Sequence, residues 1–368
     1  MERFAQRGGV RLKRREWIVG LVGLAVLAGL FVYEQHVHPF DWRVFLEQFA
    51  KAHWRNAAAG VACIYVGYIL RAVRWAWLMR PTKRVSSLSL LGTQVMGFTA
   101  VALIGRIADP VRPYLVAKKT QVPVSVQIAV YVVERLFDAG SMAILFFTAI
   151  LLSPAGTLPH QEVFNKVAQG GLIATIAGGL FLVAVRLAGK AVATLCERSL
   201  APFSRKLARG IGEKILAFHA GLDTLRTPAD FAAALAISLT MWCLITFAYV
   251  EGVSAFLPTG QAATNLLGRC LALMAGGGVA SSLQLPVIGW FTQIAALQVM
   301  LGPLFGMTAE TAMACAATLL AITFLSIAPI GLLWAQFEHI SLRQVTKESE
   351  SGTDGQQPAA AANEAVTP

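Results

Sequence analysis

The chain has 368 residues, of which 56% are hydrophobic and only 14% are charged, and its formal net charge is +11. Soluble domains carry about 25% charged residues, so this composition excludes an ordinary soluble protein and indicates a membrane protein. Because the apolar runs are continuous rather than alternating, we expect an all-α integral membrane protein and not a β-barrel. A basic chain can also bind nucleic acid, but no nucleic-acid-binding motif is present, so no nucleic-acid partner is expected.

Nine apolar segments follow one another along the chain. Several of them approach or exceed the roughly 20 residues that a helix needs to cross a bilayer. The first is too long for a signal peptide and lacks a cleavage site, so we expect an uncleaved span. Residues 41–54, between the first two segments, are amphipathic and aromatic, which predicts a helix at the membrane interface. The segments lie at about residues 17–33, 56–79, 86–104, 124–152, 167–188, 229–257, 265–285, 287–305 and 308–335.

Basic residues predict the orientation of these segments. Residues 1–16 carry six Lys and Arg residues, residues 71–84 carry five and residues 190–228 carry seven. Lys and Arg are enriched in short cytoplasmic loops. We therefore expect a basic cytoplasmic N-terminus at 1–16, a cytoplasmic loop at 71–84 and a cytoplasmic linker at about 189–228.

The stretch GRIADPVRPYLVAKK, residues 105–119, directly follows an apolar run. An even number of crossings must join the cytoplasmic residue 84 to the cytoplasmic linker, and segments 124–152 and 167–188 already supply two. We therefore expect 86–104 to enter the membrane, turn near Gly105–Pro113 and return as a re-entrant hairpin. Irregular backbone is tolerated at membrane depth only where it is buried in protein or lines a wet cavity, so this turn predicts a cavity.

The apolar run at 265–305 is interrupted in a similar way, by the sequence SSLQLPVIGWFTQ at 281–293. The charge pattern does not distinguish two spans from a second hairpin here. Interrupted segments in corresponding halves of a chain are typical of transporters with inverted repeats. We expect one membrane domain over 17–340, with about six full transmembrane helices, two broken or re-entrant hairpins and an inverted repeat. Residues 341–368 are small and polar, which predicts a disordered cytoplasmic tail.

Ionised residues inside an apolar helix are the first candidates for a site. Glu134 and Asp138 share one face of the predicted helix AVYVVERLFDAGSMAILFF, and Arg135 can pair with Asp138. Such residues cost a few kcal/mol each on membrane insertion and usually face the protein interior or a water-filled path. They could organise a binding site, or they could serve only as structural ion pairs.

Other candidates surround the two interruptions. A partly desolvated arginine suits a lipid phosphate, because its planar fork binds two oxygens. Arg106 and Arg112 could play this role, or they could pair with Asp109 and the acids of the next helix. Arg269 is a second candidate phosphate ligand that could instead snorkel to the interface. Gln293 is a polar group that needs a partner at depth.

Enzyme signatures are lacking from the sequence. There is no G-x-S-x-G, P-loop, H-E-x-x-H or G-x-G-x-x-G context. The five cysteines and six histidines show no metal-ligand cluster. We therefore expect no enzymatic activity, no cofactor and no metal.

GRIADPVRPYLVAKK, followed by VERLFD, resembles the signature of the lysylphosphatidylglycerol synthase transmembrane-domain family, which is also described as flippase-like. The residues that match its pattern run from Gly105 to Leu115 and from Val133 to Asp138. At the second interruption, PVIGWFTQIAAL departs from the family pattern, since Trp290 replaces a glycine and Gln293 stands near the usual acid.

This resemblance implies a multi-pass protein of the inner (plasma) membrane, with both termini cytoplasmic, that moves a lipid between leaflets. The expected substrate is an anionic phospholipid or a polyprenyl-phosphate-linked lipid, held by the candidate residues above. The alternative is a non-transporting scaffold for a lipid-modifying enzyme or a glycosyltransferase, with the basic linker as its docking surface. The sequence does not indicate an oligomeric state.

Overall fold

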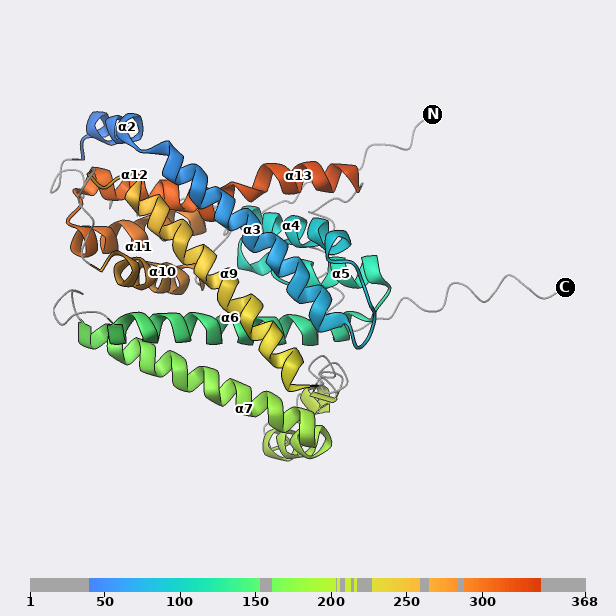
Figure 1. Cartoon of the computed structure of the whole chain (residues 1–368). Coiled ribbons are helices and arrows are strands. Elements are labelled where there is room, and N and C mark those ends of the chain that lie inside the picture. Colours follow the sequence, from blue (N-terminus) through green and yellow to red (C-terminus); the bar gives the residue numbers. More distant parts are fainter. Residues whose placement is uncertain are drawn as a thin grey trace, which may run out of the picture.

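The computed structural model places most of the chain, and all of its elements are helices in this described part (Figure 1). The all-helical class predicted from the composition is confirmed. The basic N-terminus, the first apolar segment, the tail and much of the linker after residue 202 lie outside the described residues. The structure describes residues 40–152, 161–202, 227–258, 265–282 and 288–338, with a few residues between 204 and 216.

Four helical stretches in this part are long and apolar enough to cross a membrane. They are α3 (Trp54–Met79), α4 (Ser87–Ile104), α9 (Pro228–Ser254) and a last stretch over Ala309–Phe337. The last stretch combines α12 (Ala309–Leu320), a π-helical turn labelled η3 (Ala321–Leu325) and α13 (Ile327–Phe337). The chain is thus a multi-pass helical membrane protein, while the count of six full spans stays a prediction.

The helices α3 and α9 cross the middle of the molecule side by side (Figure 1). Below them in this view, α6 (Val124–Leu152) packs along α7 (Gln161–Leu200). The helix α6 also contacts α3, α5, α9 and α10, so it packs against helices from both interrupted regions and against the central pair. The short α2 (Trp42–Lys51) packs on α12. Asp41 caps its N-terminus, because the Asp41 carboxylate accepts hydrogen bonds from two backbone N–H groups of the first turn.

The charged stretch after α4 folds into a helical hairpin. Gly105 ends α4 with φ 93° and ψ −171°, a conformation open almost only to glycine. The chain then forms a 3₁₀ turn, η1 (Arg106–Ala108), and the short α5 (Val111–Thr120), which packs back on α4. Lys83 Nζ, just before α4, donates to the carbonyl of Thr120 at 2.8 Å. The end of α5 therefore lies beside the beginning of α4.

A second pair of helices, α10 (Leu266–Ser282) and α11 (Ile288–Phe305), pack against each other around the other interruption. The indole N–H of Trp290, near the start of α11, donates to the carbonyl of Ala102 at 2.6 Å. The start of α11 thus touches the last turn of α4, and the two interrupted regions meet inside the molecule.

Candidate functional site

A buried ion-pair cluster joins α3 to α6 at the centre of the bundle. Arg74 of α3 is fully buried, and its guanidinium donates to Glu134 Oε1 and to Asp138 Oδ1, both at 2.7 Å. It also donates to the hydroxyl of Ser238 on α9 at 2.7 Å. Three helices are therefore fixed together through one side chain.

Arg112 of α5 reaches the same cluster from the other side. Its guanidinium donates to both oxygens of Glu134, at 3.0 and 2.9 Å, and to Gln94 Oε1 at 2.7 Å. It also lies 4.2 Å from the centre of the Phe98 ring, a cation–π distance. Arg112 is fully buried and is not part of the lining of the adjacent cavity described next, so its observed contacts are those of an internal ion pair.

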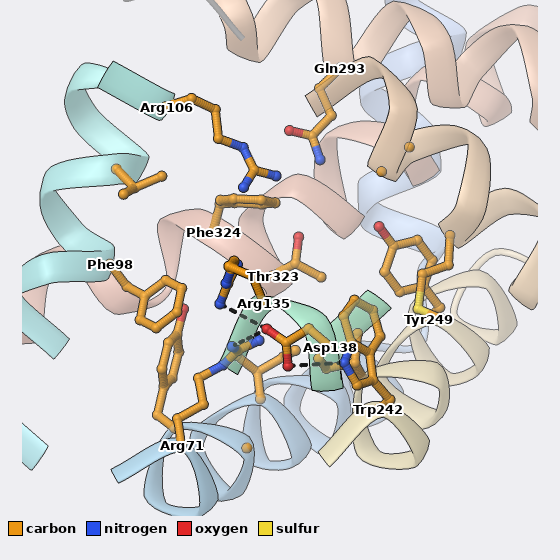
Figure 2. Close-up of a pocket in the computed structure, with 18 of the residues that line it drawn as sticks. Arg71, Phe98, Arg106, Arg135, Asp138, Trp242, Tyr249, Gln293, Thr323 and Phe324 are labelled. Atoms are coloured by element: carbon orange, nitrogen blue, oxygen red, sulfur yellow. Dashed lines mark hydrogen bonds and ion pairs between the residues drawn. The ribbon is translucent and has the colours of Figure 1, made fainter. Parts of the chain in front are cut away.

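Next to the cluster lies a cavity of about 180 Å³, which has room for several water molecules. Figure 2 shows Arg71, Arg135 and Asp138 on one side of it, with Arg106 and Gln293 directed into the same space. Helices from both interrupted regions contribute to its wall, together with α3, α6, α9 and η3. The remaining lining residues are Ile64, Gly67, Tyr68, Phe98, Val101, Asp109, Trp242, Ile245, Tyr249, Met274, Gly277, Gly278, Thr323 and Phe324.

Two arginines face this cavity from the cluster. Arg135 Nη2 lies 2.8 Å from Asp138 Oδ2, and Arg71 Nη1 lies 3.5 Å from the same oxygen. Arg71 also stacks over the Phe98 ring at 4.7 Å. The indole of Trp242 donates to the other oxygen of Asp138 at 3.3 Å, so this carboxylate is surrounded by donors.

The charges of the cluster do not balance. We call Arg74 and Arg112 the back pair, because they are fully buried, and Arg71 and Arg135 the front pair, because they line the cavity. These four guanidinium groups share two carboxylates, those of Glu134 and Asp138. The back pair alone matches the two carboxylates, so the front pair presents two excess positive charges to the cavity.

The rest of the polar lining is closer to neutral. Arg106 pairs with Asp109 at 3.7 Å, at the tip of the first hairpin. Gln293 is only 2% exposed, and its Oε1 accepts no hydrogen bond from the described residues. A buried amide oxygen without a donor is unfavourable, so a ligand or water in the cavity would stabilise it.

The structure thus brings together seven of the eight residues singled out in the sequence. Five line the cavity, whereas Glu134 and Arg112 form the layer beneath. Arg269, in the first turn of α10, does not line this cavity. The five lining residues are Arg106, Asp109, Arg135, Asp138 and Gln293.

Two residues of the cluster escaped the sequence prediction. Arg71 and Arg74 were expected in a loop at 71–84, and the loop is wrong for these two residues, because α3 continues to Met79 and contains both. Their carboxylate partners on α6 are some 60 residues away in sequence, so the pairing was not visible locally. The available signal was their place inside the apolar segment 56–79 at i,i+3 spacing, which puts them on one helix face.

The sequence model described as the lysylphosphatidylglycerol synthase TM region matches residues 17–331. The chain belongs to this family. Comparison with curated proteins and with solved structures gives no match. Membership in the lysylphosphatidylglycerol synthase TM-region family confirms the resemblance carried by residues 105–119 and VERLFD, and it supports the multi-pass membrane assignment.

Proposed function

We propose that this member of the lysylphosphatidylglycerol synthase TM-region family translocates an anionic lipid between the leaflets of the inner (plasma) membrane of the cell. One observation carries the proposal: two excess positive charges face a cavity inside an apolar helical bundle. Uncompensated charge is expensive at membrane depth, so ionised side chains there mark sites for substrates or ions. A lipid headgroup carrying phosphate would supply the missing negative charge.

The arrangement of the interrupted helices supports transport rather than catalysis. The cavity lies where the tip of the first hairpin meets the start of α11, and secondary transporters place their binding sites between such broken helices. In our proposal the headgroup occupies the cavity while the acyl chains stay in the bilayer. The protein would act without enzymatic chemistry, with both termini in the cytoplasm.

Reconstitution tests this proposal directly. Purified protein in proteoliposomes should move fluorescent phosphatidic acid or phosphatidylglycerol between leaflets faster than protein-free vesicles do, measured by dithionite quenching. Arg71→Ala and Arg135→Ala should reduce the rate at least tenfold. The matched control is Arg80→Ala, which removes an exposed arginine at the end of α3.

A scaffold for a membrane enzyme predicts the opposite result. Such a protein would show no flipping in any variant, although it would fold normally. Equal rates for wild-type vesicles and empty vesicles with both anionic lipids would therefore reject the translocase proposal.

A further inference from the structure

The two excess positive charges at the cavity indicate how much negative charge the lipid headgroup should carry. We infer that the front pair selects a lipid phosphate monoester, which carries a terminal phosphate close to dianionic, over a phosphodiester headgroup. This inference rests on the proposed function, since it names the substrate class of that same site. Its basis is the separation of the cluster into a neutral back layer and a charged front layer.

Three of the four carboxylate oxygens in the cluster accept hydrogen bonds from the back pair. Both oxygens of Glu134 accept from the back pair, and Asp138 Oδ1 accepts from Arg74 and from Trp242. The fourth oxygen, Asp138 Oδ2, faces the front pair, 2.8 Å from Arg135 Nη2 and 3.5 Å from Arg71 Nη1. The front pair therefore shares one carboxylate oxygen, and its two charges remain in excess of the two carboxylates that the back pair already matches.

The front pair also has unused donors. Arg71 Nη1 and two nitrogens of Arg135, Nε and Nη2, are shielded from solvent and donate no hydrogen bond of good geometry to a described residue, although Arg71 Nη1 and Arg135 Nη2 lie within ion-pair distance of Asp138 Oδ2. A monoester offers three terminal oxygens and a charge of about −1.5 to −2 at neutral pH. A diester offers two free oxygens and a single charge, so it would leave one excess positive charge in the cavity.

No other charge in the described lining offsets this excess. Arg106 and Asp109 pair with each other at the hairpin tip. The other polar side chains of the lining, such as Tyr68, Tyr249 and Thr323, are uncharged in their ordinary states. The count of two excess charges therefore holds for the lining that the structure describes.

The remaining wall favours a lipid over free phosphate as the source of the monoester. Ile64, Val101 and Met274 belong to a lining in which apolar surface exceeds polar surface. An inorganic phosphate would leave this surface unfilled, whereas the glycerol or isoprenoid carbons next to a lipid phosphate would cover it.

Binding of short-chain lipids separates these ligands. Detergent-purified full-length protein would be titrated calorimetrically with dioctanoyl phosphatidic acid, dioctanoyl phosphatidylglycerol and inorganic phosphate. We expect phosphatidic acid to bind at least tenfold more tightly than phosphatidylglycerol. Arg71→Gln should lower this ratio to about threefold or less, since it removes one excess charge, whereas Arg80→Gln should leave it unchanged.

Each other result overturns the inference. Equal affinity for phosphatidic acid and phosphatidylglycerol would show that the second negative charge of the monoester does not contribute to binding. Inorganic phosphate binding as tightly as phosphatidic acid would identify free phosphate as the ligand. If Arg71→Gln unfolds at the normal temperature and keeps the wild-type ratio of affinities for the two lipids, Arg71 does not contribute to the preference for the monoester. Flipping of labelled phosphatidylglycerol is a separate readout, so the translocase proposal can stand when the monoester inference fails.

Discussion

Arg71 and Arg74 differ in their surroundings although they lie one turn apart on α3. Arg74 is fully buried and makes three short hydrogen bonds across two helices, whereas Arg71 lines the cavity with 12% of its side chain exposed. Breaking a buried ion pair by removing one partner costs about 3–5 kcal/mol, because the other charge is left uncompensated. Substitution of Arg74 should therefore mainly reduce stability, whereas substitution of Arg71 should mainly reduce transport.

We predict that Arg74→Ala lowers the free energy of unfolding by about 3–5 kcal/mol. Arg71→Ala should lower it by a smaller amount, since Glu134 and Asp138 keep their contacts to the back pair. Thermal unfolding of the purified variants in detergent, followed by tryptophan fluorescence, measures both changes. Equal destabilisation by the two substitutions would contradict the division into front and back layers.

At this scale the sequence indicated the acids better than the arginines. Glu134, Arg135 and Asp138 stand out because they interrupt an apolar helix, and the structure places all three in the cluster. Arg71 and Arg74 lie near the basic end of a span, where arginines usually mark the cytoplasmic side. Only the packing of α3 against α6 distinguishes a buried, paired arginine from one that marks the cytoplasmic side of a span. That packing joins residues far apart in the sequence, so it could not be predicted locally.

Among the elements, the hairpin of α4 and α5 depends on one backbone conformation. Gly105 has φ 93°, and there a side chain would be strained by about 1–3 kcal/mol. We predict that Gly105→Ala destabilises the protein by this amount and slows flipping more than its stability loss explains, because it displaces Arg106. Gly210→Ala is the matched control, since Gly210 has a negative φ and no close neighbour around its Cα. A variant with wild-type unfolding and transport would show that the turn is not constrained.

The helices themselves were largely predictable, and their interruptions were predictable in part. The expected segment at 124–152 coincides with α6, and 86–104 differs from α4 by one residue at its start. The π-helical turn of η3 was not foreseen, since Ala321–Leu325 is an ordinary apolar sequence. It places Thr323 and Phe324 in the cavity wall, and π-helical turns commonly occur at functional sites.

For the whole molecule, the contact between the two interrupted regions matters most. Trp290 donates to Ala102 across this junction, and a hydrogen bond of this kind contributes about 1 kcal/mol. If a headgroup passes only when the junction opens, Trp290→Phe should raise the flipping rate by up to about fivefold, since an aromatic ring is kept and the hydrogen bond is lost. The dithionite assay measures this rate. A slower rate in a normally folded variant would show that the contact supports transport instead of restraining it.

The last prediction concerns whether water reaches the centre of the bundle. Gln293 and Leu297 lie one turn apart on α11 and are similarly buried, at 2% and 0% exposure, but only Gln293 lines the cavity. Leu297 belongs instead to an apolar cluster with α9, α10 and α12. A cysteine at position 293 should therefore react with a membrane-impermeant thiosulfonate reagent in proteoliposomes, and one at 297 should not.

Site-resolved mass spectrometry distinguishes these positions from the five native cysteines, whose reaction in the wild-type protein sets the background. Because a bound headgroup would fill the same space, dioctanoyl phosphatidic acid should slow the labelling of Gln293→Cys and leave the native cysteines unaffected. Equal protection of both positions from the reagent, without lipid, would mean that the cavity is dry. The excess charge of the front pair would then have to be neutralised within the protein, and a headgroup could not enter by this route.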